Sequence, residues 1–443
     1  MCLEQQICTS IAHQISSPNS HHLSLNTYSD TPLITKIRKS ITSYSRNMKT
    51  RFFLNSDLSK EWKKHMTATS YTRRYDLDWL RVIAFALLIF YHVGMFYVSW
   101  DWHVKSQYAS TSAEWLMELL NPWRLALLFF ISGVALRFAA DKMSLSSLLG
   151  RRIYRLGLPM VFGMAVIVMP QSYFQMRQAG LIEQGMLHYW QHIYLNFNDP
   201  LPLTTPTWNH LWYVIYLLVY SLILTPIYAL LKHFSTRINL PSIHQQPIIL
   251  GLSLLVIIPL PFILFSIFLD PLFPTTHALS DDWANHAHRF TIFLIGFSVA
   301  KSSLFWRAIS RSWKFWGVGV LALVIWANAM IEGLIPTPSF MSDNLEDSLE
   351  VYYAWGVIVT LLGAAQHYLN KPSTILTYLN QAIFPYFILH QTLIISAGYI
   401  LTQLNLGIWA EFAGVLVITT AGCLLLERII RYIKPIRPLF GLN

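Results

Sequence analysis

Two ionisable residues, Arg81 and His92, lie inside one long apolar segment of the chain. Residues 77–100 are long and apolar enough to cross a bilayer as a helix. An ionisable side chain in hydrocarbon is costly, so it normally faces the protein interior and marks a functional path. Their spacing turns a helix through about 20° more than three full turns, so both side chains share one face. The rise between them is about 16 Å, which predicts Arg81 near one membrane surface and His92 well inside.

This pair of residues could carry acid–base chemistry. Imidazole titrates near neutral pH, so a neutral His92 could act as a general base on a hydroxyl group. Asp78 lies within about 60° of both residues and could orient the site electrostatically. The structural alternative is an interfacial arginine that reaches the headgroups and a histidine bonded to a neighbouring helix. The cost of intramembrane charge favours the functional interpretation.

A second candidate group is the pair Arg152 and Arg155, whose spacing places both side chains on one helical face. Guanidinium groups bind phosphate through two parallel hydrogen bonds. The pair could therefore hold a soluble phosphorylated donor, or it could only anchor the topology, and the residues alone leave both open. The chain has no Cys/His spacing typical of a metal site, so no metal is expected.

Polar residues in later apolar segments are weaker candidates. Ser132 could bond back to its own helix, while Gly133 beside it would let two helices approach closely. His210 is expected at the outer surface. His390 is expected toward the middle of a span that Pro385 could kink. A lone membrane histidine is more often a satisfied hydrogen bond between helices than a catalytic group.

The composition indicates an all-α, polytopic membrane protein. Hydrophobic residues make up 54% of the chain and charged residues only 12%, against about 25% charge in soluble domains. About ten membrane-spanning helices are predicted, at residues 77–100, 115–138, 156–176, 210–232, 247–269, 288–301, 313–335, 349–369, 378–404 and 407–426.

The charge distribution predicts the orientation of these spans. With the N-terminus inside, 27 of the 32 Lys and Arg residues fall on the cytoplasmic side, as the positive-inside rule requires. Both termini are therefore expected in the cytoplasm. Topology accounts for the net charge of +10, so no nucleic-acid partner is expected, although basic side chains can contact anionic membrane lipids.

Two regions differ in character. Residues 1–70 are polar, without a sustained apolar run, and are predicted to be a disordered cytoplasmic extension. Residues 71–437 are predicted to form one membrane domain. Within it, the loop at 177–209 is expected to cap the membrane helices.

Five motifs follow one another in an order that resembles the acyltransferase 3 family of bacterial integral membrane acyltransferases. The opening of the first span looks particularly like the branch that contains the succinyl-transferring glucan biosynthesis protein C. The resemblance covers about residues 72–435. The motifs are Arg81-x10-His92, Phe129-Phe-x-Ser-Gly133, Arg152-x-x-Arg155, His210-Leu-Trp-Tyr213 and Pro385-Tyr386-x-x-x-His390.

The resemblance implies a ten-helix fold that moves an acyl group from a cytoplasmic donor to an acceptor presented across the membrane. The family's catalytic pair falls on Arg81 and His92, and its donor-binding pair on Arg152 and Arg155. Supporting roles would fall on Asp78, Ser132, His210, Tyr386 and His390.

The implied activity is membrane O-acyl transfer in the bacterial inner membrane. We expect an acyl-coenzyme A as co-substrate, no bound cofactor, and a hydroxyl of a glucan, another carbohydrate or a lipid-linked group as acceptor. The alternative is a transporter or flippase of a sugar or lipid-linked substrate, which would also place Arg and His in the membrane. The absence of an internal sequence repeat and the basic cluster on the soluble-donor side favour the transferase.

Overall fold

The computed structural model describes residues 73–196, 204–235, 248–336, 338 and 341–442. Within these ranges every regular element is helical, which confirms the predicted all-α class. The disorder predicted for residues 1–70 falls outside the described residues. Residues Arg74–Asn443 form one structural unit, and all elements below belong to it.

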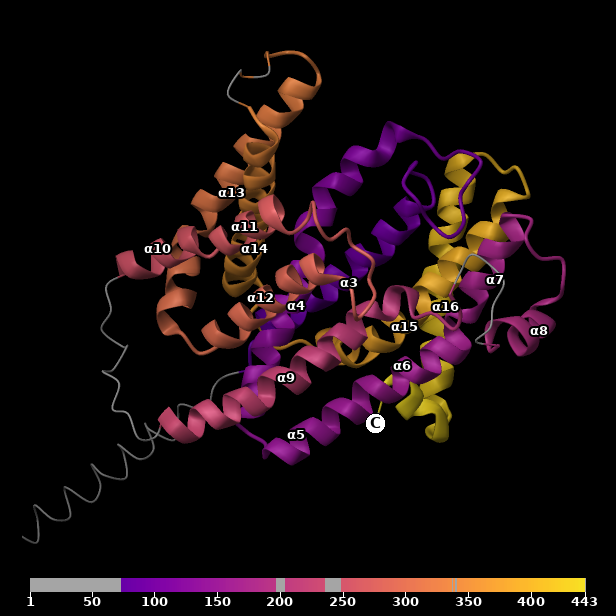
Figure 1. Cartoon of the computed structure of the whole chain (residues 1–443), viewed down its shortest axis with the longest axis horizontal. Helices are drawn as coiled ribbons and strands as arrows, with labels where there is room; N and C mark the ends of the chain where they lie inside the picture. Colours follow the sequence, from indigo (N-terminus) through magenta and orange to yellow (C-terminus); the bar gives the residue numbers. More distant parts are fainter. Residues whose placement is uncertain (1–72, 197–203, 236–247, 337, 339–340, 443) are drawn as a thin grey trace, which may run out of the picture. The chain divides into compact units, whose positions relative to one another are not determined.

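Long apolar runs form the main helices, and polar, Gly- or Pro-containing turns separate them (Figure 1). The elements are α3 (Tyr75–Met95), η1 (Thr111–Ala113), α4 (Glu114–Ala140), α5 (Leu145–Arg152), η2 (Ile153–Gly157), α6 (Leu158–Phe162), η3 (Gly163–Ile167), α7 (Met169–Gln178), α8 (Met186–His188), η4 (Tyr189–Tyr194), η5 (Asn209–Leu211), α9 (Trp212–Ser235), α10 (Ile248–Ile257), α11 (Leu260–Phe268), α12 (Trp283–Val299), α13 (Ser303–Ile331), α14 (Asp343–Tyr368), α15 (Thr374–Thr402), α16 (Ile408–Tyr432) and η7 (Lys434–Phe440).

Nine helices of the described part of the chain are long and apolar enough to cross a membrane, so the protein is a polytopic membrane protein. The sixth predicted span, 288–301, corresponds to α12, a helix of 17 residues. Such a helix rises about 26 Å, slightly less than a hydrocarbon core of about 30 Å. These nine spans and the shorter α12 together account for the ten predicted segments.

The third span begins earlier than the sequence predicts. It runs from Leu145 to Gln178, because α5 continues through two π-helical turns, η2 and η3, into α7. Single π-helical turns inside helices are frequent at functional sites. The following segment packs back on this span, where the Trp190 indole donates to the carbonyl of Ala165 (2.8 Å) and the Tyr194 hydroxyl to that of Met164 (2.7 Å).

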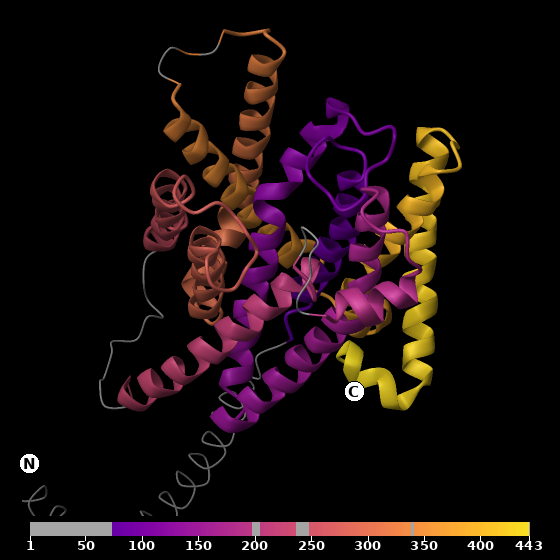
Figure 2. The ribbon, with the colours of Figure 1, turned by 45° about the vertical axis from the view of Figure 1, so that its right-hand side comes forward.

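Helices α3 and α15 hold the residues of interest. α3 packs against α4, α14 and α15, and α15 also contacts α7 and lies beside α16. Figures 1 and 2 show α15 and α16 in yellow, with the magenta α7 next to them. Segments more than 300 residues apart in the sequence, such as α3 and the end of α16, therefore meet around one interior.

Two glycines set the contact between α4 and α12. A Cβ atom at Gly133 would lie 2.0 Å from the carbonyl oxygen of Phe293, and one at Gly296 would lie 2.1 Å from that of Phe130. The neighbouring backbone occupies the space that any larger side chain would need. The close helix contact predicted from the small residue after Ser132 is confirmed.

We predict that Gly133→Ala destabilises the protein, because a backbone carbonyl cannot move aside as a flexible side chain can. Overpacking of this kind costs about 1–3 kcal/mol or more, measurable as a lower thermal unfolding temperature in detergent. The control is Gly319→Ala in α13, where nothing lies within 4 Å of the added Cβ atom. Equal unfolding temperatures for the two variants would contradict the close crossing.

The orientation predicted from the basic residues can be tested with single cysteines. In a variant whose native cysteines are replaced by serine, Glu183→Cys and Glu332→Cys should react with a membrane-impermeant maleimide added outside intact cells. Lys142→Cys should react only after the membrane is opened. All three positions are exposed side chains. Labelling of Lys142→Cys in intact cells would contradict the predicted orientation.

Candidate active site

A cavity of about 740 Å³ collects the predicted donor-binding residues. Arg81, Arg152 and Arg155 all line it, although the sequence separates the first from the other two by some 70 residues. Among the described residues, the lining contains no carboxylate side chain and six arginines, which are Arg81, Arg151, Arg152, Arg155, Arg431 and Arg437. A cavity of this charge is suited to bind a multiply negative ligand.

The Arg152–Arg155 pair spans the end of α5 and the π-helical turn η2. Both side chains face the cavity, as their spacing predicts. Arg155 donates from Nη2 to the carbonyl oxygen of Gly441 (3.3 Å). Arg152 forms no hydrogen bond or ion pair with the described residues, so its planar donor group is available to a ligand.

Arg81 is fixed at the same cavity by two side chains. Its Nη2 donates to the amide oxygen of Asn380 on α15 (2.5 Å) and lies 3.7 Å from Asp78 Oδ1. Asp78 therefore lies on the same side of α3 as Arg81, as predicted, and forms an ion pair with it.

Ser132 also lines the cavity, but it does not bond to its own helix, which had been the simpler interpretation. Its hydroxyl pairs with the hydroxyl of Tyr213 on α9 (2.9 Å). The sequence could not show this contact because α4 and α9 meet only in the folded chain. Tyr213 is the last residue of the predicted His-Leu-Trp-Tyr motif, so two of the five motifs meet here.

His92 occupies the other end of α3. The helix ends at Met95, earlier than the predicted 100, and His92 lies in its last turn. The chain then folds back, and the ring of Trp102 stands 5.2 Å from the imidazole of His92. His92 does not line the arginine cavity. The structure thus assigns the two residues of the predicted catalytic pair to separate places on one helix.

His92 pairs with His390, and the surroundings determine which nitrogens carry protons. His390 Nδ1 lies 2.6 Å from the carbonyl oxygen of Phe387, which can only accept, so Nδ1 of a neutral His390 holds the proton. His390 Nε2 must then accept the 2.8 Å bond from His92 Nδ1. A neutral His92 is left with an unprotonated Nε2, the nitrogen that a general base needs.

His210 is buried within the protein, with 6% of its area exposed, and its position at the outer membrane surface stays a prediction. Its Nε2 donates to the carbonyl of Ile388 on α15 (3.1 Å), and its Nδ1 faces the amide of Gln171 (3.4 Å). Asn209 also bonds to Gln171 (3.0 Å). These bonds to buried partners draw the start of α9 inward. His210 therefore supports α15 next to His390, whose ring centroid lies 5.2 Å away.

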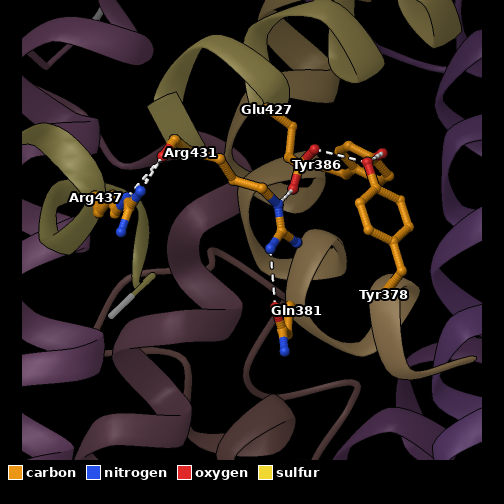
Figure 3. A network of polar contacts seen from close by, with 6 residues as sticks. All are labelled: Tyr378, Gln381, Tyr386, Glu427, Arg431 and Arg437. Carbon is orange, nitrogen blue, oxygen red and sulfur yellow. Dashed lines mark hydrogen bonds and ion pairs between the residues drawn. The ribbon is translucent and has the colours of Figure 1, made fainter. Parts of the chain in front are cut away.

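The Tyr386 hydroxyl belongs to a different hydrogen-bond network from the ring of His390. Its hydroxyl stands 3.4 Å from that of Tyr378, which donates to Glu427 (2.7 Å) (Figure 3). This network continues to Arg431, a residue of the arginine cavity. Tyr386 and His390 are four residues apart, close to one helical turn, so they lie at different depths along α15.

An aromatic group links the two halves of the site. Phe85 and Tyr213 line the arginine cavity, and the ring of Phe387 lies 5.4 Å and 5.8 Å from theirs. Phe387 also stands 5.8 Å from His390. Contacts among these three rings therefore connect the lining of the arginine cavity to His390.

Two residues near His92 were missed by the sequence reasoning. Arg124 is only 3% exposed, its guanidinium lies 3.4 Å from the ring centroid of Tyr91, and its Nε and Nη1 have no partner among the described residues. A charge in a predicted span was the signal for it. His103 donates to Gln175 Oε1 (2.7 Å); burial lowers the pKa of His103, and this hydrogen bond opposes the shift.

The acyltransferase domain family, acyltransferase 3, matches residues 74–428. The chain belongs to this family. Glucans biosynthesis protein C of Escherichia coli strain K12 is 27% identical over 147 residues, which cover 33% of this chain and 37% of that protein. The same protein in strains O1:K1 / APEC and O139:H28 gives the same values. The matched region thus spans little more than a third of these relatives. No solved structure matches the chain significantly.

The hydrogen-bond chain predicts the tautomer of His92. In protein labelled with ¹⁵N-histidine, the ring of His92 should show a protonated Nδ1 and an unprotonated Nε2, with its signals assigned by their loss in His92→Gln. His390→Leu should abolish this preference because it removes the acceptor. His390→Gln is the matched control, since its amide oxygen can still accept. A protonated Nε2 on His92 of the unaltered protein would refute the assignment.

Proposed function

We propose that this protein is a membrane O-acyltransferase that moves an acyl group from cytoplasmic acyl-coenzyme A to a hydroxyl group of a carbohydrate or lipid-linked acceptor. The observation that carries the proposal is one helix, α3, with an arginine cavity at one end and an oriented histidine pair at the other. Membership of the acyltransferase 3 family supports the reaction class.

Arg152 and Arg155 would hold the donor's phosphates. Charge-assisted hydrogen bonds from guanidinium to phosphate are short and roughly twice as strong as neutral ones. Under the topology predicted from the basic residues, this cavity opens on the cytoplasmic side, where a soluble donor is available. Arg81, already held by Asp78 and Asn380, would add a fixed charge beside them.

The acyl end of the donor would reach His92 past the aromatic group of Phe85, Tyr213 and Phe387. The rise of about 16 Å between Arg81 and His92 separates the phosphate-binding and reactive ends. An extended, mostly uncharged arm is the part of coenzyme A suited to such a path, because the rings offer apolar contacts and the Ser132–Tyr213 pair supplies hydroxyl groups.

In the transfer step, Nε2 of His92 would take the proton of the acceptor hydroxyl as its oxygen attacks the thioester carbonyl carbon. The carbon–sulfur bond would then break, and the protonated His92 would return the proton to the leaving thiolate. His390 would accept a hydrogen bond from Nδ1 throughout and stabilise the ring's orientation. Arg124 lies over the ring of Tyr91, the residue that precedes His92. Its buried positive charge would stabilise the negative charge that develops in the transition state.

The acceptor is the least constrained partner. Proteins named glucans biosynthesis protein C are among the relatives, so a glucan is the first acceptor to test, in the bacterial inner membrane. Other carbohydrate and lipid-linked hydroxyl groups fit the same chemistry. Fold and family alone are a weaker basis for the substrate than the site itself.

The proposal predicts that His92→Gln lowers transfer of labelled acyl groups from acyl-coenzyme A to glucan by about 10²–10⁴-fold. Donor binding should stay unchanged, because the arginine cavity does not contain His92. The assay uses full-length protein in lipid nanodiscs. His188→Gln, which alters an exposed histidine, is the control.

Two results would count against this function. Wild-type protein that transfers no acyl group to glucan, other carbohydrate or lipid-linked acceptors, yet moves such a substrate across vesicles, would be a transporter. A correctly assembled His92→Gln protein that keeps more than about a tenth of wild-type transfer would exclude His92 as the general base.

A further inference from the structure

The last residues of the chain complete the arginine cavity. Arg431 from the end of α16, and Arg437, Gly441 and Leu442 from the segment that follows, all line it. We refer to residues 434–442 as the C-terminal segment. In the sequence, this stretch looks like a short basic segment that follows the last membrane span. In the structure, its residues line the same cavity as Arg152 and Arg155.

The cations at this side of the cavity are held in fixed positions (Figure 3). Arg431 forms an ion pair with the fully buried Glu427 and donates from Nη1 to Gln381 (2.8 Å). Arg437 donates from Nε (2.8 Å) and Nη2 to the carbonyl oxygen of Arg431. Nη1 of Arg437 is not used in these bonds and stays available to a ligand.

The far end of the C-terminal segment is also fixed. Gly441 has a φ of 67°, and a Cβ atom there would lie 2.4 Å from the ring of Phe384, so only glycine fits. The Gly441 carbonyl accepts a hydrogen bond from Arg155 (3.3 Å), and the ring of Phe440 packs 5.3 Å from that of Phe162. The C-terminal segment therefore lines the cavity in a fixed position.

The charges of the cavity exceed what one phosphate group requires. Arg81 has Asp78 as a partner and Arg431 has Glu427. The other four arginines form no ion pair among the described residues, and they are Arg151, Arg152, Arg155 and Arg437. A phosphomonoester carries a charge of about −1.5 to −2 at neutral pH. Three of the four come from residues 151–155, whereas Arg437 comes from the other end of the chain.

We propose that Arg437 forms a second phosphate subsite, distinct from that of Arg152 and Arg155, and that it receives the 3′-phosphate of the coenzyme A donor. Coenzyme A carries phosphate in two places, a diphosphate bridge and a 3′-phosphomonoester. Arg152 and Arg155 hold the diphosphate, and the C-terminal segment holds the monoester. This inference rests on the proposed function, since it names the part of the same donor that each wall of the cavity binds.

The test compares binding of coenzyme A and of 3′-dephospho-coenzyme A to full-length protein in detergent by isothermal titration calorimetry. Wild-type protein should bind coenzyme A more tightly. Arg437→Gln should weaken coenzyme A binding by about 10- to 150-fold, the loss expected for one charge-assisted contact, while leaving 3′-dephospho-coenzyme A unchanged. Arg152→Gln should weaken both ligands by similar factors.

The matched control is Arg428→Gln, because Arg428 is an exposed arginine of α16 that does not line the cavity. It should leave both affinities unchanged. The ratio of the two affinities does not depend on the fraction of folded protein, so partial misfolding cannot imitate the expected result.

Equal weakening of both ligands by Arg437→Gln, or no weakening of either, would overturn the second subsite while leaving the proposed donor intact. A wild-type protein that binds neither ligand would overturn the donor assignment of the proposed function itself, and the subsite with it.

Discussion

Hydrocarbon cannot solvate charge, and this constraint governs the charged and polar side chains of the described membrane spans. The protein gathers six arginines around one cavity, and His92, His210 and His390 bond to one another or to backbone carbonyls. The carbonyl of Phe387 has the largest consequence, because as an acceptor it fixes the proton of His390, and His390 in turn fixes that of His92. A backbone group thus determines which nitrogen of a neutral His92 carries the proton.

The same constraint explains why α15 is central. Pro385 lies inside α15 and has no N–H, so the carbonyl of Gln381, four residues earlier, loses its helical partner. The carbonyls of Phe387 and Ile388, which follow the proline, accept bonds from His390 and His210. The two histidines are therefore structural partners of α15 as well as neighbours of His92. Their placement depends on a helix far from α3 in sequence.

Much of this arrangement follows from sequence patterns. Apolar length predicts the spans, and the helical repeat predicts that Arg81 and His92 lie at opposite ends of one helix. The Arg152–Arg155 spacing correctly puts both side chains on one face. These successes concern local geometry, which a helix sets through its own repeat.

The errors and omissions concern contacts between helices, for which the repeat of one helix contains no information. The sequence did not show that His210 is buried between α7 and α15, where Gln171 and the carbonyl of Ile388 are its partners. Tyr386 was grouped with His390 by proximity in sequence, whereas Glu427 on α16 places Tyr378 and Tyr386 in another network. Arg437 was not singled out from the sequence, since nothing local shows that the chain turns back toward Arg155.

Arg81 and His92 lie at opposite ends of α3, and this separation is compatible with both residues serving one site. One continuous helix, α3, connects them, so the distance between the anion-binding end and the basic nitrogen is set by a rigid element. A reaction between a soluble donor on one side and an acceptor on the other needs such a fixed span. In the proposed reaction the arginines would anchor the donor's charge outside the hydrocarbon, and only its uncharged end would pass the rings of Phe85, Tyr213 and Phe387. In the proposed reaction, this division lets charge stay at the membrane edge while the bond changes occur beside His92.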